Sequence, residues 1–129
     1  MRIEEYFEHL RETIDNSPIV RTYTVTYDKR GTHEGFIRGE IYFIDDSALH
    51  LREFVDVEGS IERMMYVYHY LDESNNLIFR YDNTGHHRKL KLPSYPHHKH
   101  ESSEENVIAT SAPELALVLN EIEGIIPAG

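Results

Sequence analysis

The chain has 129 residues, no cysteine and a formal net charge of −10. The length suits one domain spanning residues 1–129, and the lack of cysteine excludes disulfides, zinc-thiolate sites and thiol catalysis. No apolar run approaches the roughly 20 residues that cross a bilayer, and the amino terminus has no signal-peptide pattern, so a cytoplasmic protein with no membrane partner is expected. The acidic balance argues against a general nucleic-acid coat.

Two segments have the spacing of amphipathic helices. The first runs from Ile3 to Ile14 with an apolar stripe, and Asn16-Ser17-Pro18 should end it. The last begins with a predicted capping box, in which Ser111 is the N-cap, Glu114 follows three residues on and proline occupies the first turn. The two predicted buried stripes are Ile3, Tyr6, Phe7, Leu10 and Ile14 in the first helix, and Leu115, Val118, Leu119, Ile122 and Ile126 in the last.

The segments between these helices have the composition and period of β-strands. Five strands are predicted, with short polar turns between them that favour an antiparallel meander. Residues 83–106 are expected to be irregular, and residues 107–109 can add one short strand. We therefore predict an α+β fold, a curved antiparallel sheet of about five strands flanked by an N-terminal and a C-terminal helix. The five predicted strands are residues 19–27, 36–44, 49–57, 61–71 and 77–82.

Glu53 and a row of tyrosines stand out within these strands. Glu53 falls on the apolar parity of its strand, so it is either at a sheet edge or a carboxylate directed into a cleft. Tyr66, Tyr68 and Tyr70 share one face, which favours packing under a helix, although Tyr68 or Tyr70 can also border a site. His69 has the opposite parity and is interpreted as a packing histidine.

Positive charge gathers between Arg80 and His100, where five lysines and arginines face one acidic residue, Asp82. A local positive site on an acidic protein suits a small anion or an RNA strand. Arg80 lies on the last predicted strand, from which it can hold a phosphate, or it can form a weak surface ion pair with Asp82. Asn83 is expected to turn the chain.

Five of the nine histidines lie in the same region, and His69 precedes them. In extended chain His98 and His100 project to one side, which suits an acid–base pair for ribonuclease-type cleavage, with lysine or arginine on the phosphate. The same pair, with His86, His87 or Glu53, can instead hold a divalent metal that activates water, or the histidines can belong to a solvated loop. The clustered residues are His86, His87, His97, His98, Lys99 and His100.

Several of these blocks together resemble the TumE-like toxin family of type II toxin–antitoxin modules. They are Tyr66 to Tyr70, Ile78 to Asn83, His86-His87 and Pro96 to His100, and the resemblance extends from about Leu49 to the final helix. It implies a toxin whose gene lies beside that of a helix-turn-helix antitoxin. The positions that match the family's recurring polar residues are Arg80, Asp82, Asn83, His86, His87, His98, Lys99 and His100.

The leading hypothesis is therefore a cytoplasmic toxin that cleaves RNA by acid–base catalysis without a metal or cofactor. His98 and His100 would transfer protons, Arg80 and Lys99 would bind the phosphate, and Glu53 or Tyr68 would support them. The alternatives are a non-catalytic module that docks a partner protein, with or without zinc, and a metal-dependent nuclease. The expected partners are the cognate antitoxin and an RNA substrate.

Overall fold

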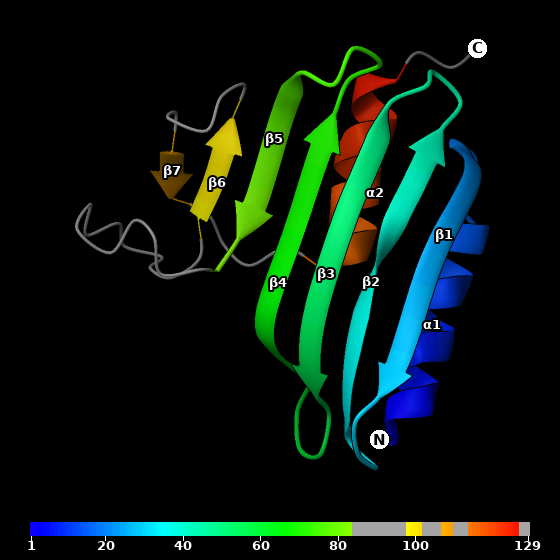
Figure 1. Cartoon of the computed structure of the whole chain (residues 1–129), viewed down its shortest axis with the longest axis vertical. Helices are drawn as coiled ribbons and strands as arrows, with labels where there is room; N and C mark the ends of the chain where they lie inside the picture. The colour runs from blue at the N-terminus through cyan, green and yellow to red at the C-terminus, as the bar shows by residue number, and fades with distance from the viewer. Residues whose placement is uncertain (84–97, 102–106, 110–113, 127–129) are drawn as a thin grey trace.

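A computed structural model describes residues 1–83, 98–101, 107–109 and 114–126, with residues 98–101 and 107–109 described by their strand pairing alone. Helix α1 precedes seven strands, and helix α2 follows them (Figure 1). No helix in these ranges is long and apolar enough to cross a membrane. The elements are α1 (Ile3–Asp15), β1 (Val20–Lys29), β2 (Glu34–Phe43), β3 (Ala48–Asp56), β4 (Glu62–Leu71), β5 (Leu77–Asp82), β6 (His98–Glu101), β7 (Val107–Ala109) and α2 (Leu115–Ile125).

The strands form one sheet in chain order, β1 to β7, and every neighbouring pair is antiparallel. This arrangement confirms the predicted α+β class, the five strands and their meander. It also confirms a short strand at Val107–Ala109. The prediction of an irregular segment was wrong for His98–Glu101, which pairs with β5 as strand β6. Histidine, lysine and glutamate have little strand propensity. This segment forms a strand because the edge of β5 offers backbone N–H and C=O groups with which it can pair.

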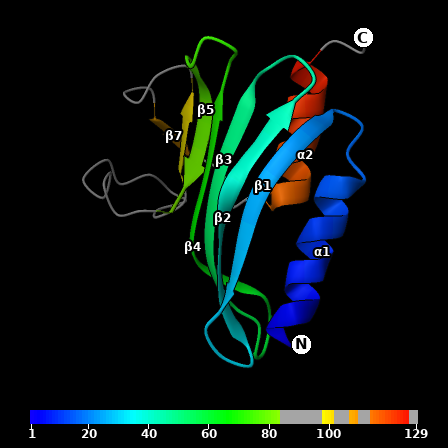
Figure 2. The ribbon, with the colours of Figure 1, turned by 45° about the vertical axis from the view of Figure 1, so that its right-hand side comes forward.

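Both helices pack on one face of the sheet, and no helix of the described residues lies on the other, which is called the uncovered face below (Figure 2). The two predicted apolar stripes are buried in full, and α2 is further tied to the sheet by a hydrogen bond of 2.6 Å from the Tyr81 hydroxyl to Glu121 Oε1. Each large side chain buried in this way contributes about 1.5–3 kcal/mol through removal of apolar surface from water. The predicted start of α2 was wrong, because the helix begins at Leu115 with Glu114 as N-cap. Ser111 lies outside the described residues.

A close approach between β1 and β2 depends on Gly39. A Cβ atom at this position would lie 2.2 Å from the backbone oxygen of Thr24 and 2.6 Å from the Cα of Val25. Only glycine allows two backbones to come this near. Gly39 has the parity of the helix-covered face, in register with Val25 and Leu51, so its missing side chain allows the close approach of the strands and only its backbone borders the other face.

Candidate functional site on the uncovered face of the sheet

Three successive rows of side chains cross the uncovered face at right angles to the strands. Residues opposite one another in an antiparallel pair share a face, so the strand register defines each row. Along β2, β3 and β4, the aromatic row is Phe36, Phe54 and Met65, and the arginine row is Arg38, Arg52 and Val67. The histidine row continues over more strands, as Glu40, His50, His69 and Arg80, and the residue paired with Arg80 on β6 is His100.

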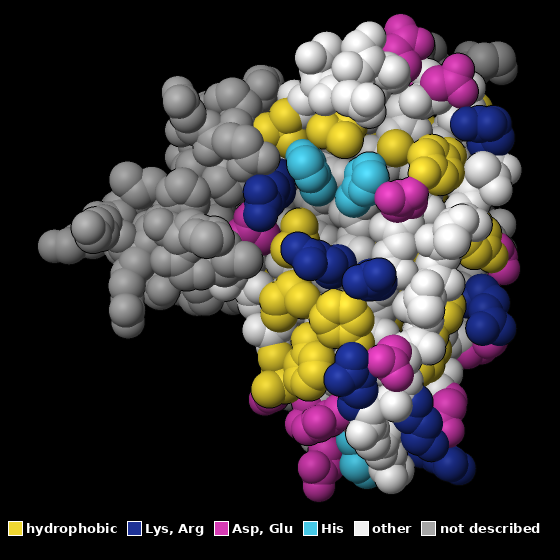
Figure 3. All heavy atoms as spheres, viewed as in Figure 1, with side chains coloured by type: hydrophobic (Ala, Val, Ile, Leu, Met, Phe, Trp, Pro, Cys, Tyr) yellow, Lys and Arg dark blue, Asp and Glu magenta, His cyan; other side chains and the backbone are white. Residues whose placement is uncertain are grey.

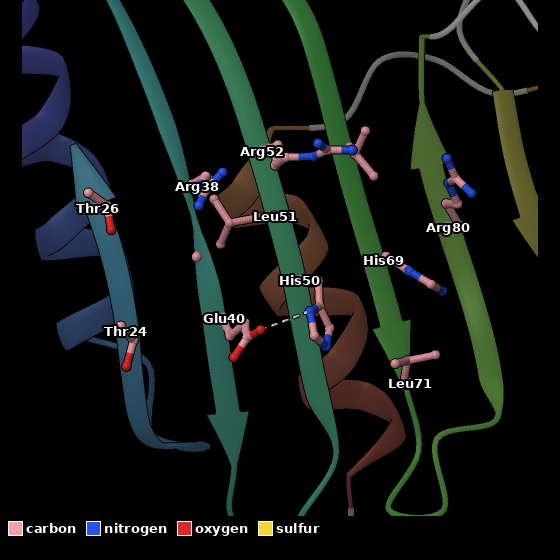
Figure 4. Close-up of a pocket in the computed structure, with 12 residues that line it drawn as sticks. Thr24, Thr26, Arg38, Glu40, His50, Leu51, Arg52, His69, Leu71 and Arg80 are labelled. Atoms are coloured by element: carbon pink, nitrogen blue, oxygen red, sulfur yellow. Dashed lines mark ion pairs between the residues drawn. The ribbon is translucent and has the colours of Figure 1, made fainter. Parts of the chain in front are cut away.

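The arginine and histidine rows border a shallow hollow of about 690 Å³. Figure 3 shows this face, with two histidine side chains next to one another, basic side chains below them and hydrophobic ones below those. Figure 4 shows that the labelled side chains come from the five strands β1 to β5, with threonines at the β1 side and Arg80 at the β5 side. The hollow therefore has a mixed lining of charged, polar and aliphatic residues and extends across the sheet.

His50 lies at the middle of the histidine row, between Glu40 and His69. Its Nδ1 is 3.4 Å from Glu40 Oε1 (Figure 4), and its ring centroid is 6.2 Å from that of His69, with the planes 48° apart. A carboxylate beside one ring nitrogen favours a proton on that nitrogen. His50 is therefore bordered by a carboxylate on one side and an imidazole on the other.

The arginine row places two like charges directly opposite one another. Arg38 on β2 pairs with Arg52 on β3, and both side chains are exposed. Like charges at opposed positions destabilise a sheet. Within the part of the chain that the structure describes, neither arginine has an ion-pair partner. Two exposed guanidinium groups on a chain of net charge −10 provide a local site for an anion.

Arg80 closes the β5 side of the hollow. Its Nε is 2.9 Å from Oδ2 of Asp82, whose side chain has no exposed surface, whereas 23% of the Arg80 side chain is exposed. This is a mostly buried ion pair, and the sequence had allowed only a weak surface pair at these two positions. Asp82 therefore fixes the guanidinium at the border of the hollow.

Strand β6 brings two of the predicted histidines to this border. His100 is paired with Arg80, and His98 is paired with Asp82. Lys99 is paired with Tyr81, a position of the other parity, so the positions of His100 and His98 are opposite those of Arg80 and Asp82. His86, His87 and His97 lie outside the described residues.

Glu53 and Tyr68 do not join these groups, because they lie on the helix-covered face. The Glu53 carboxylate is fully buried and accepts hydrogen bonds from the hydroxyl of Tyr6 on α1 and, at 2.7 Å, from the hydroxyl of Tyr68. Arg63 donates to the Tyr68 hydroxyl at 3.0 Å. Burial raises the pKa of Glu53. Glu53 therefore lies neither at a sheet edge nor in an open cleft, the two predicted alternatives. Its hydrogen bonds join helix α1 to the sheet.

Asn83 also has a role within the fold. Its Oδ1 accepts a hydrogen bond of 2.9 Å from the backbone N–H of Tyr66, and its Nδ2 donates to the carbonyl of Met64 at 3.2 Å. The side chain thus continues the hydrogen-bonding pattern between β4 and β5 for one more residue. Asn83 directly follows the last residue of β5, and the turn predicted at this position would involve residues outside the described ranges.

The sequence interpretation missed the central residues of this face. The period-two alternation of residues 49–57 already placed His50 and Arg52 opposite the apolar parity, and His69 was interpreted as a packing residue. Alternation along one strand does not show which residue of the next strand lies opposite. This register pairs Arg38 with Arg52 and His50 with His69. In the described residues, no group of three His, Asp or Glu side chains is arranged to hold a metal ion.

Comparison with known proteins identifies a family. A family model described as "Toxin TumE" matches residues 10–126. No curated protein and no solved structure matches the chain. The matched region includes all seven strands and α2, and so it contains the whole uncovered face.

Proposed function

The chain belongs to the TumE toxin family, and we propose that this toxin is an endoribonuclease that acts at the border between β5 and β6. The observation that carries the proposal is the register of these strands, in which His100 is paired with Arg80 and His98 with Asp82. Two histidines at alternate positions of one strand, beside a fixed arginine, are the groups that acid–base cleavage of a phosphodiester requires.

The proposed reaction needs no group beyond these side chains. One imidazole, from His98 or His100, takes the proton of a 2′-hydroxyl as its oxygen attacks the adjacent phosphorus. The bond from phosphorus to the 5′-oxygen breaks, and the other imidazole protonates that oxygen, leaving a 2′,3′-cyclic phosphate. Cα atoms two residues apart in a strand are about 6.6 Å apart, which leaves room for a phosphate between the two rings. Arg80 would stabilise the negative charge that develops on the phosphoryl oxygens.

The two cations predicted for the phosphate are not equivalent in this proposal. Arg80 borders the hollow and is fixed by Asp82, whereas Lys99 has the alternate register position. We therefore expect Arg80→Ala to lower the cleavage rate about 100-fold or more and Lys99→Ala to lower it less. Glu53 and Tyr68 are assigned to the stability of the fold and take no part in the reaction.

The proposal is tested by incubating the purified toxin with total RNA, with and without EDTA, beside the His98→Ala and His100→Ala variants. His9→Ala is the matched control, since His9 is exposed on α1, in the layer of helices. Cleavage that persists in EDTA, persists in the control and is lost in both β6 variants would support the mechanism.

Two results would contradict this mechanism. Cleavage abolished by EDTA would assign the histidines to a metal-dependent nuclease. No cleavage by a folded protein that is toxic in cells would exclude RNA hydrolysis and favour a binding module that docks a partner protein. Circular dichroism of each variant establishes that it is folded.

An antitoxin is the partner that membership of a toxin family suggests. We propose that it is a helix-turn-helix protein encoded beside the toxin, whose basic segments bind the acidic parts of the toxin surface. Co-expression of the neighbouring genes followed by purification through a tag on the toxin tests this proposal. Recovery of the toxin chain alone would contradict it.

A further inference from the structure

The centre of the uncovered face carries a second site, separate from the histidines of β6. We infer that the arginine row and the aromatic row bind the substrate strand as single-stranded RNA, with phosphate on Arg38 and Arg52 and a base stacked on Phe54. This inference rests on the proposed function, and it adds the class of RNA and the residues that hold it. It uses strands β2 and β3, whereas the proposed chemistry uses β5 and β6.

The charge pair is the first part of the argument. Arg38 and Arg52 are directly opposed and exposed, and no carboxylate among the described residues pairs with them. Two opposed guanidinium groups repel each other in the free protein, and an anion between them removes that repulsion. A guanidinium group also offers paired N–H donors that match two oxygens of a phosphate. The site thus suits a phosphodiester.

The aromatic pair is the second part. Phe36 and Phe54 are directly opposed on the same face, one row away from the arginines, and both are only half-buried. Two residues along a strand correspond to about 6.6 Å, so a phosphate on the arginine row places the attached nucleoside near these rings. The Arg30 guanidinium lies over the Phe36 ring, 6.0 Å from its centroid, so Phe54 is the partly exposed ring that provides a face on which any base can stack. An acidic peptide would use the arginines and would gain little from such a platform.

The combination selects single strands over duplexes. In A-form RNA each base is stacked between its neighbours, and its faces are closed to protein side chains. A duplex would reach the arginine row with its phosphates alone and would leave Phe36 and Phe54 uncovered. The hollow is shallow and extends from the threonines of β1 to Arg80. A single strand bound along the hollow would lead from the arginine row toward the β5 border, where the cleavage site is proposed.

The test measures binding and cleavage separately. The probe is a short fluorescent RNA whose 2′-hydroxyls are methylated, so that it cannot undergo the proposed cleavage, and it is titrated with toxin as a single strand and as a duplex. We expect the single strand to bind at least about tenfold more tightly. Equal affinity for the two forms would overturn the inference, whatever the result of the cleavage experiment.

Variants then assign the two parts of the site. Arg52→Gln should weaken single-strand binding about tenfold and reduce the slope of log K against log salt by about 0.7, the value for one lost phosphate contact. Phe54→Leu should weaken it by a similar factor and leave the slope unchanged, whereas Phe54→Tyr should keep the affinity. The matched control is Arg2→Gln, which removes one exposed arginine near α1, away from the uncovered face.

An unchanged salt dependence in Arg52→Gln, or equal weakening in Arg2→Gln, would show that the arginine row does not hold phosphate. Full RNA binding by Arg52→Gln together with loss of antitoxin binding would assign this face to the antitoxin and would also overturn the inference. A toxin that binds single strands as described and does not cleave RNA would refute the proposed chemistry alone.

Discussion

Arg80 and Asp82 lie two residues apart on β5 and form an ion pair of 2.9 Å in which the carboxylate is fully buried. The pair joins the interior of the protein to the border of the hollow, since Arg80 is partly exposed there. Burying a carboxylate is costly unless a cation and hydrogen bonds compensate for the lost water. Arg80 is thereby fixed in place before any phosphate binds, which lowers the entropic cost of binding.

Replacement of Asp82 should therefore cost more stability than replacement of an exposed partner. We expect Asp82→Asn to lower the free energy of unfolding by about 2 kcal/mol, because it leaves a mostly buried guanidinium without its counter-charge. Asp28→Asn breaks the exposed Arg30–Asp28 pair, which has a similar length of 2.8 Å, and should cost less than about 0.5 kcal/mol. Urea unfolding of both variants measures the difference, and equal losses would contradict it.

The buried carboxylate of Glu53 should behave as a structural group. Glu53→Ala leaves the hydroxyls of Tyr6 and Tyr68 without their acceptor, and we expect a loss of about 3 kcal/mol. Glu53→Gln preserves the side-chain volume and one acceptor oxygen, so it should lower the free energy of unfolding by less than Glu53→Ala does. Chemical denaturation of the two variants at neutral pH tests this order. The same loss in both would show that the hydrogen bonds contribute little.

The tyrosines of the same network predict that the protein becomes less stable in alkali. Burial, reinforced by the Glu53 charge, raises the pKa of Tyr6 and of Tyr68 above 10.0, and burial raises that of Tyr66 to about 12. Unfolding then releases protons, because the unfolded chain ionises its tyrosines at lower pH. Stability is fully present below about pH 10 and should fall as the pH rises through the folded-state pKa values.

Urea midpoints measured from about pH 8 to about pH 11 test this pH dependence. Tyr6→Phe removes one of the responsible groups, so the decline should be shallower in this variant than in the wild type. A midpoint that stays constant through this range, or an identical decline in Tyr6→Phe, would exclude the buried tyrosines as the cause.

The close approach of β1 and β2 should depend on Gly39. Gly39→Ala places a methyl group 2.2 Å from the backbone oxygen of Thr24, and a backbone cannot move aside as a flexible side chain can. We expect a loss of about 3 kcal/mol in thermal or chemical unfolding. Gly59→Ala is the matched control, because its Cβ would have no neighbour within 4 Å. Equal stabilities of the two variants would contradict the close approach of β1 and β2.

The sequence by itself determined the local structure of this protein. Alternation at period two defined five strands, and spacing at period 3.6 defined both helices and the stripes that they bury, because these patterns depend on neighbours along the chain. The same patterns placed Glu53 on the apolar parity and placed His50 opposite it. They did not identify β6, whose residues have little strand propensity and pair with β5 only because that edge is free.

The tertiary structure alone decided which side chains meet. Pairing between strands brings Arg38 to Arg52, His50 to His69 and Arg80 to His100, and a shift of one residue in any register would move these groups to the other face. The helices likewise decided the role of Glu53, since they cover its face and leave the arginine and histidine rows open. Neither the strand register nor the face that the helices cover can be predicted from spacing along the chain, because both depend on packing between segments distant in sequence.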